Sequence, residues 1–469
     1  MKFQPQLPRF AQAKLAMTAA GAEMAQLEFT HTQNDLKNLA ESILNRAKNL
    51  GATSAQLEIN ESIETGVDVL NGNIESVETS YDSSIALTVY VGQNRGNVGI
   101  SQVPPGDLDM IIHQALDIAK YTQADPISGI ADKEDLCTSF TDNLQLYNPT
   151  PLDNAQIIKH ALELEKIGLT TDKQVNASDG AAINLGKYNF VIANTNGLNL
   201  GYTTTRYSKS LSLIGQTKKG MQTDYWYSNA RDYNDLDSNL DLATHAIYRV
   251  KRRLNQGKIK GGSYPVIFES TIAKSLISTY FGAISGGSLY RNLSFLNNSL
   301  NTQVFPEWLT ITEDPFVIKG SSSCYFDNEG VNVCRRDLVK NGIVNGYLLS
   351  CYSARKLSMR PTGNAGGNHN IQVSSNTEGD INALAADMKR GLVIIETIGH
   401  GVNMVTGDYS VGASGLWVEN GKIKFFVEGL TIAGNLKNIF KDIRYISNDY
   451  RKGSIQCGSM LVEGIDVSI

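Results

Sequence analysis

The stretch "TGVDVLNGNIESVET" (65–79) decides the fold of the first half of this chain, because it carries the pattern of a β-hairpin. Apolar and polar residues alternate on either side of Asn71-Gly72, a pair that favours the tight turn between two antiparallel strands. The same alternation occurs in "SAQLEINES" (54–62) and "SSIALTVYVG" (83–92). We therefore expect several antiparallel strands over this region.

Helical periodicity precedes and follows these strands. Apolar residues recur every three or four positions over 32–50, 107–121 and 153–167. Thr32 is suited to cap the first of these helices and Gly51 to end it. Because helices and hairpin-like strands come in runs and do not alternate strictly, the expected fold class is α+β.

The length of 469 residues predicts two domains, since one hydrophobic core rarely serves so long a chain. We expect a poorly ordered leader at 1–30, an N-terminal domain of helices and antiparallel strands at 31–250, and a C-terminal β-rich domain at 262–469. The boundary follows a basic amphipathic helix at about 240–254. We assign its cations to the helix C-terminus, in preference to a phosphate site.

The C-terminal domain is predicted to be mostly antiparallel sheet, barrel-like, with one opening helix. "VENGKIKFF" (418–426) places Asn420-Gly421 between two strand-like runs and indicates a further hairpin. The opening helix spans 271–285. Ser270 is suited to cap it, and Gly286-Gly287 to break it.

Charge and cysteine content narrow the class of protein. The formal net charge is −5 with both signs spread along the chain, which argues against a dedicated nucleic-acid binder. Five scattered cysteines without a CxxC spacing indicate reduced thiols in the cytoplasm. We expect no membrane span, because no apolar run approaches the roughly 18 residues required. We expect no signal peptide either, because Lys14 interrupts the apolar part of the N-terminus.

Residue spacing gives little support for catalysis by this chain alone. The six histidines include no pair at i, i+4 and no HExxH, so no local zinc motif is present in the sequence. GxSxG is absent too. Cys457, in "GSIQCGSM" (453–460), is a candidate nucleophile that His369 or His400 could serve. A buried thiol without a function explains the same residue.

Two glycine-rich segments are candidate binding loops. "RPTGNAGGNHN" (360–370) lacks the Lys-Ser/Thr of a P-loop, and its backbone must approach either a peptide ligand or another loop. "GHGVNMVTGDYSVGASG" (399–415) is a polar connection between two strands, and such connections often bind ligands. The candidate peptide-contacting residues in these loops are Gly363, Asn364, Gly366, Gly367, His369, His400, Asn403 and Asp408.

The segments 326–370, 399–423 and 427–459 resemble the TldE branch, also called PmbA, of the TldD/TldE family. "GMQTDYWYSNAR" (220–231) fits the same family. The resemblance implies a cytoplasmic two-domain α+β protein that assembles with a TldD-type partner into a zinc-dependent peptidase. It implies unfolded or short peptides as substrates. The family's older label, modulator of DNA gyrase, gains no support from the charge balance as direct DNA binding.

The resemblance also gives the opening helix an interpretation. In the TldD branch this segment carries HExxxH, in which two histidines bind zinc and the glutamate activates water, and a cysteine near the C-terminus adds a ligand. Laid on that pattern, Ser278 and Ala283 occupy the histidine positions and Thr279 the glutamate position, while Cys457 falls at the cysteine. Because these side chains cannot hold a catalytic zinc, we expect no metal or cofactor in this chain and zinc in the TldD-type partner.

Three functions follow from these observations. The leading hypothesis is a non-catalytic subunit, or pseudo-enzyme, that shapes the peptide cleft of a TldD/TldE-type heterodimer. The second is a self-sufficient peptidase based on Cys457 or on a non-standard metal site. The third is a homodimeric peptide-binding or scaffold protein without a proteolytic role.

Overall fold

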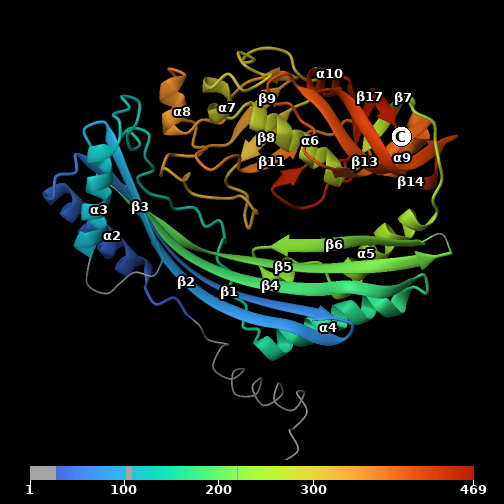
Figure 1. Cartoon of the computed structure of the whole chain (residues 1–469), viewed down its shortest axis with the longest axis horizontal. Helices are drawn as coiled ribbons and strands as arrows, with labels where there is room; N and C mark the ends of the chain where they lie inside the picture. Colours follow the sequence, from blue (N-terminus) through green and yellow to red (C-terminus); the bar gives the residue numbers. More distant parts are fainter. Residues whose placement is uncertain (1–27, 102–107, 219) are drawn as a thin grey trace, which may run out of the picture.

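The computed structural model describes residues 28–101, 108–218 and 220–469. A long curved sheet with four helices forms one part of the molecule, and a β-rich C-terminal part lies over the concave side of that sheet (Figure 1). Most of the predicted leader at 1–30 lies outside the described residues. In the described part, no helix combines the length and apolar character needed to cross a membrane.

The curved sheet is antiparallel throughout and has the strand order β3-β2-β1-β4-β5-β6. Asn71 and Gly72 join its first two strands with φ angles of 53° and 73°, so the predicted tight hairpin is confirmed. The strands are β1 (Ser54–Leu70), β2 (Asn73–Val91), β3 (Asn94–Ser101), β4 (Val175–Asn194), β5 (Asn199–Thr217) and β6 (Gly220–Ala230).

Helices cover only one face of this sheet. Alternate residues of β1, such as Ile59 and Val67, are fully buried beneath helices, while Glu64 and Asp68 between them face the concave side. The helices are α2 (Gln33–Asn49), α3 (Leu108–Tyr121), α4 (Asn154–Thr171) and α5 (Asn239–Leu254). The predicted helices are therefore confirmed, and the opposite face of the sheet is left for the C-terminal part.

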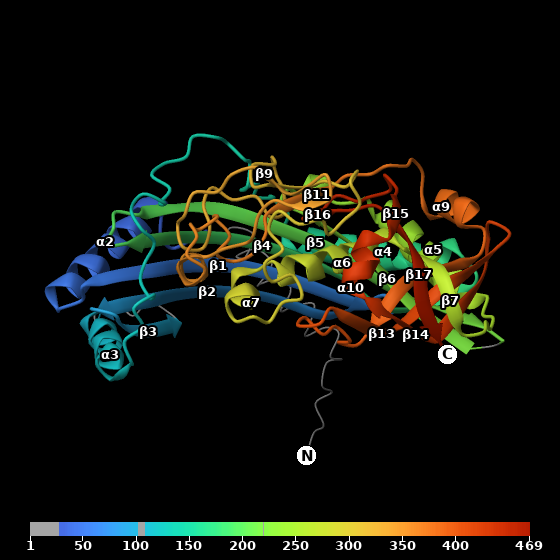
Figure 2. The same cartoon turned by 90° about the horizontal axis from the view of Figure 1, so that it is seen from above.

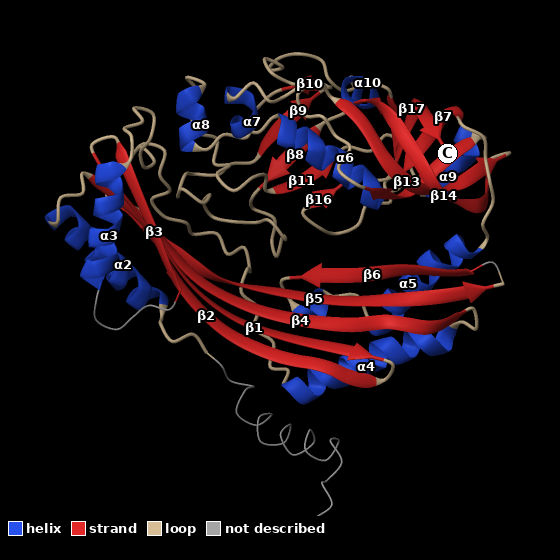
Figure 3. Ribbon diagram, in the orientation of Figure 1, coloured by secondary structure: helices blue, strands red, loops and turns tan. Residues whose placement is uncertain are grey.

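The C-terminal part contains a closed barrel and a second sheet (Figure 3). Strands run β14-β13-β12-β7-β17, and β17 pairs back with β14 to close the barrel. The second sheet has the order β10-β9-β8-β11-β16, so the expected barrel-like, mostly antiparallel fold is confirmed. The barrel strands, with β15 paired to β17, are β7 (Gly262–Phe268), β12 (Gly391–Ile398), β13 (Asp408–Glu419), β14 (Lys422–Asn435), β15 (Ile443–Ile446) and β17 (Met460–Ser468).

The remaining elements surround the second sheet and the barrel ends. Its strands are β8 (Ile311–Asp314), β9 (Arg336–Lys340), β10 (Ile343–Val344), β11 (Asn370–Val373) and β16 (Ile455–Gln456). The helices of this part are α6 (Ser270–Ala283), α7 (Gly286–Tyr290), α8 (Cys351–Lys356), α9 (Ile381–Met388) and α10 (Leu436–Lys441), and a short 3-10 turn, η2 (Tyr233–Asp235), precedes α5.

Helix α6 packs one face into the core of the C-terminal part, where Ala273, Ile277 and Tyr280 are completely buried. The helix begins one residue earlier and ends two residues earlier than the expected 271–285, and Ser270 does not have the predicted capping role. Ser270 is its first residue and does not cap it; the N-cap position is Glu269, whose side chain makes no capping bond. The helix ends before the two glycines, because Ile284 is its C-cap and Gly286 begins α7.

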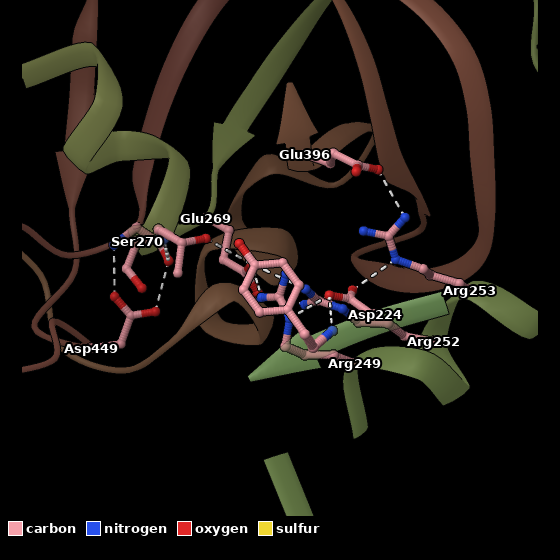
Figure 4. A network of polar contacts seen from close by, with 11 residues as sticks. Asp224, Arg249, Arg252, Arg253, Glu269, Ser270, Glu396 and Asp449 are labelled. Atoms are coloured by element: carbon pink, nitrogen blue, oxygen red, sulfur yellow. Dashed lines mark hydrogen bonds and ion pairs between the residues drawn. The ribbon is translucent and has the colours of Figure 1, made fainter. Parts of the chain in front are cut away.

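Glu269 belongs to a buried ion network that joins the two parts of the molecule (Figure 4). Asp224 on β6 accepts hydrogen bonds from Arg249, at 3.0 Å, and from Arg253, at 2.7 Å, both on α5. Arg249 and Arg252 donate to Glu269 at the start of α6. Two of the cations at the end of α5, Arg252 and Arg253, are therefore partners of buried carboxylates.

Arg253 extends this network to the barrel by donating to Glu396 on β12 at 2.8 Å. Burial raises the pKa of Asp224, but the charges of Arg249 and Arg253 outweigh burial and hold the pKa below its usual value. Asp224 is therefore ionised and paired in the folded protein at neutral pH.

Replacing Asp224 with alanine leaves two buried arginines without their carboxylate. We expect Asp224→Ala to lower the free energy of unfolding by about 3–5 kcal/mol, the usual cost of breaking a buried ion pair from one side. Urea unfolding measures this change. Asp117→Ala is the control, because the Asp117–Lys120 pair is well exposed and its loss should leave the unfolding midpoint unchanged.

The same ion network gives a direction for the effect of pH. Because the folded pKa of Asp224 lies below the unfolded value of about 3.9, its contribution to stability is present above that value and is lost as the pH falls through the folded pKa. Asp224→Asn should show a smaller acid-induced loss of stability than the parent chain. An equal loss in both proteins would contradict the assignment.

Candidate functional site

A cavity of about 1700 Å³ lies between the concave face of the curved sheet and the C-terminal part. Residues of β1, β2, β4, β5 and β6 form one wall. Residues of α6, β8, β11 and β16, with the segments 317–322 and 451–454, form the other. Figure 2 shows these C-terminal elements lying across the strands of the sheet. Both parts of the molecule therefore contribute residues to this cavity, which is the candidate functional site.

Helix α6 presents one stripe of side chains to this cavity. Thr271, Lys274 and Ser278 line it at the spacing of one helix face. The Ser278 hydroxyl donates to the backbone oxygen of Lys274 at 2.9 Å, and the Thr279 hydroxyl donates to that of Ser275 at 3.0 Å. Both hydroxyls are thus bonded to their own helix.

The other two positions equivalent to the zinc site of the TldD branch are buried. Ala283 has no exposed surface and offers no donor atom. Cys457 is also fully buried, and its sulfur lies 3.4 Å from the oxygen of Gly458. Burial raises the pKa of the Cys457 thiol to about 12, with a further rise from Asp449 and a partly opposing effect of Lys274. The thiol is protonated at neutral pH and is a poor nucleophile.

These residues do not fit a catalytic zinc ion. A zinc site needs three or four histidine, cysteine, aspartate or glutamate ligands converging on one point. Among the residues that the structure describes, no group of three or more such side chains could hold a metal ion. We therefore derive no catalytic step through a metal on this chain.

His369 has a cysteine partner, but a different one from that considered in the sequence analysis. Its Nδ1 lies 3.3 Å from the sulfur of Cys324, and its Nε2 lies 2.8 Å from the carbonyl oxygen of Gly363. Because a carbonyl only accepts, Nε2 carries the proton and Nδ1 accepts from the thiol. Burial, with Asp327 and Glu313 nearby, raises the pKa of Cys324 to about 12. The Cys324 thiol is therefore protonated at neutral pH.

The loop 360–370 approaches another loop closely. A Cβ on Gly363 would come within 2.4 Å of the backbone oxygen of Asn332, and one on Gly366 within 2.6 Å of the side chain of Asn328. Asn364 is buried and donates to Glu313 at 2.8 Å and to the carbonyl oxygen of Gly367 at 3.1 Å. Close contact with a neighbouring loop accounts for these glycines and for this amide.

The predicted loop 399–415 is shorter in the structure: residues 399–407 connect β12 to β13, and 408–415 already belong to β13. The connection is held mainly by polar groups within it and at its end. The side-chain oxygen of Asn403 accepts from the backbone of Val405, and Asp408 accepts from Thr406 and from Asn435. His400 is exposed. None of the eight loop residues singled out from the sequence is among the described residues that line the cavity. Their contact with a peptide stays a prediction.

The sequence analysis missed most of the cavity wall. Gln372 and Gln456 are register partners in the parallel pair of β11 and β16, and both line the cavity. Arg451 lines it too, with its guanidinium carbon 4.4 Å from the ring centroid of Trp226. The short β11 and β16 carry little periodicity, so no local signal marked these residues.

The state of Cys457 can be tested by alkylation. We expect iodoacetamide at pH 8 to modify the exposed Cys334 within minutes and to leave Cys457 unmodified until the chain is unfolded, because the buried thiol is protonated. Mass spectrometry of tryptic peptides measures both sites in one sample. Rapid modification of Cys457 in the native protein would contradict its burial. It would also support Cys457 as a catalytic nucleophile.

Comparison with known proteins agrees with this architecture. Residues 261–469 match the PmbA/TldA metallopeptidase C-terminal domain, residues 147–254 the central domain and residues 55–119 domain 1. A solved structure from Bacteroides thetaiotaomicron, described as a modulator of DNA gyrase, superposes with a TM-score of 0.87 at 26% identity, over 92% of this chain and 98% of that one.

Two relatives match almost end to end. The metalloprotease PmbA homolog of Haemophilus influenzae is 37% identical over 437 residues, which are 93% of this chain and 96% of that protein. The metalloprotease PmbA of Escherichia coli O157:H7 is 36% identical over 448 residues, which are 95% and 99% of the two chains. With three consecutive domain matches and relatives of this similarity, the chain belongs to the PmbA/TldD metallopeptidase family.

Proposed function

We propose that this chain is the non-catalytic subunit of a two-subunit metallopeptidase, in which it shapes the cleft that holds a peptide. One observation carries the proposal. Helix α6 lines the cavity between the curved sheet and the C-terminal part, in the manner of an active-site helix, yet Ser278, Thr279 and Ala283 supply neither zinc ligands nor a carboxylate base.

The edges of two sheets support a peptide as the bound molecule. Strand β6 is the last strand of the curved sheet and pairs only with β5, and β16 is the last of the second sheet and pairs only with β11, within the described chain. Both strands line the cavity. An extended peptide can add to such an edge through backbone hydrogen bonds, which do not depend on its sequence.

The zinc ion belongs, in this proposal, to a TldD-type partner subunit, where it would activate a water molecule for attack on the peptide bond. This chain contributes the walls of the cleft: strand edges that orient the peptide, and a closed hydrophobic core that keeps α6 in place. No proton transfer or metal binding is assigned to its residues.

A self-sufficient cysteine peptidase is a weaker explanation. It would require Cys457 to be exposed, ionised and next to a histidine, whereas the thiol is buried, has a raised pKa and does not contact His369, which bonds to Cys324. A homodimeric scaffold protein remains distinguishable by experiment, since it would not change the turnover of any partner.

The first test is the metal content of the isolated chain. We expect zinc well below one ion per chain after purification without added metal, because the residues at the family's zinc positions offer no ligand set. Inductively coupled plasma mass spectrometry measures the content, and a TldD-type protein purified in the same way is the control. About one zinc per chain would overturn the assignment and direct attention to other ligands.

The second test is co-expression with the TldD-type protein of the same genome. We expect a stable complex that cleaves an unstructured peptide, no cleavage by this chain alone, and unchanged cleavage when Cys457→Ser is used in the complex. Size-exclusion chromatography and a peptide-cleavage assay measure these outcomes. A partner that does not associate and is fully active alone would refute the subunit role, and a stable homodimer without effect on turnover would favour the scaffold function.

A further inference from the structure

Two positively charged side chains meet on the wall of the cavity. Lys274 projects from α6, and Arg451 lies in the segment that leads into β16. A Cβ on Gly453, two residues after Arg451, would lie 3.9 Å from the Lys274 ammonium nitrogen, which places this nitrogen against the same segment. The two charges are close enough that Arg451 lowers the pKa of Lys274, although burial is the larger cause.

Neither cation has an acidic partner in the described part of the chain. Within 28–101, 108–218 and 220–469, no ion pair of 4.0 Å or less joins a carboxylate to the Lys274 or Arg451 nitrogen atoms. In contrast, two other cations of the same cavity are paired, Lys319 with Asp232 and Asp235, and Arg335 with Asp314. Lys274 and Arg451 thus hold positive charge in a partly buried place without an ion-pair partner among the described residues, which is costly unless a ligand supplies negative charge.

Two of the three carboxylates whose charge acts on Arg451 are bonded to other residues. Glu269 is bonded to Arg249 and Arg252, and Asp449 accepts from the side chain and backbone of Ser459. Asp237 also lines the cavity and raises the pKa of Arg451, but burial lowers that pKa by more, and the two side chains make no ion pair. The cations are therefore available to a bound anion.

The surroundings suit one oxygen-rich anion at the end of an extended chain. The stacking of Arg451 on Trp226 orients the guanidinium plane, which favours the two-pronged bond that arginine forms with carboxylates. Gln372 and Gln456 are register partners in β11 and β16 and line the same cavity, so their side-chain amides offer further donors on this wall. The unpaired side of β16 begins directly after this segment, so a peptide added there would end or turn at the cations.

We propose that Lys274 and Arg451 form a carboxylate-binding site that anchors an extended peptide in the cavity. The proposal rests on the peptide-binding role argued above and names the group that this chain recognises. A free C-terminal carboxylate and the side chain of an aspartate or glutamate share the required chemistry. The experiment separates these two sources.

Binding is measured on the full chain with small and large probes. The small probe is N-acetyl-dialanine with a free C-terminal carboxylate, observed by saturation-transfer NMR. The same dipeptide with an amidated C-terminus is the uncharged control. The large probes are three fluorescent unstructured peptides, observed by anisotropy: one with a free C-terminus and no acidic residue, one amidated, and one amidated with a single internal aspartate. We expect the free acid to bind about tenfold or more tightly than the amide, since a charge-assisted bond is lost.

Variants of single residues test whether Lys274 and Arg451 cause the preference for the free acid over the amide. Lys274→Gln and Arg451→Gln should each reduce the ratio of acid to amide affinity towards one. Arg335→Gln removes one positive charge from the same cavity, but a charge that Asp314 already pairs, and it should leave the ratio unchanged. Thermal unfolding of each variant confirms that it is folded, and neither Lys274 nor Arg451 donates a hydrogen bond within the described structure whose loss would unfold it.

Each outcome has a distinct meaning. If the peptide with an internal aspartate binds as tightly as the free acid, the source is a side chain and the site stands. Binding of the small acid without binding of the long peptides supports the site and refutes the proposed cleft. Equal affinity for acid and amide, or a preference that survives both Lys274→Gln and Arg451→Gln, overturns the site, and it leaves the proposed function intact if the long peptides bind.

Discussion

The buried ion network between α5 and the start of α6 is the constraint on which the candidate site depends. Asp224 holds Arg249 and Arg253 from the curved sheet, and Glu269 holds Arg249 and Arg252 from the C-terminal part. A buried pair of charges adds little net stability compared with apolar packing, but its geometry is demanding, because each charge must meet its partner. The network therefore fixes where α6 begins relative to β6, and with it the distance between the two walls of the cavity.

The sequence predicted the parts of the fold whose causes are local. Asn71-Gly72 needs a left-handed backbone wherever it occurs, and the periodicity of 32–50 buries one face in any environment, so both appear as expected. The pairing of β17 with β14 and the meeting of Arg253 with Glu396 join residues distant in the chain. In a single sequence, Arg253 looks like any cation at the end of a helix, and nothing local marks its buried partner.

The candidate site likewise contains features that local sequence predicts and features that depend on residues distant in the chain. The placement of Ser278 and Ala283 on one helix could be predicted from the periodicity of α6. The burial of Cys457 could not, because it depends on strands that are distant in the sequence and pack around it. Glycine-rich loops gave the least secure prediction. Gly363 indicates that a backbone must come close to something, and that neighbour is the loop around Asn332, not the cavity. A glycine-rich sequence indicates that another group lies close to the backbone, but it does not identify that group.

The charges of the cavity wall explain how a metallopeptidase fold can serve binding alone. A zinc ion in a peptidase both attracts the negative oxygen of the substrate and lowers the pKa of a bound water, and the second effect requires an open coordination position. The ammonium of Lys274 and the guanidinium of Arg451 can perform the first task and have no means of performing the second, because they hold only donors. If the proposed site is present, Lys274 on α6 and Arg451 before β16 would attract a peptide carboxylate without supplying the group that hydrolysis requires. In the proposed role, the absence of metal ligands at Ser278, Thr279 and Ala283 and the presence of Lys274 one turn earlier on α6 have the same consequence, because this helix then positions a peptide and does not activate water.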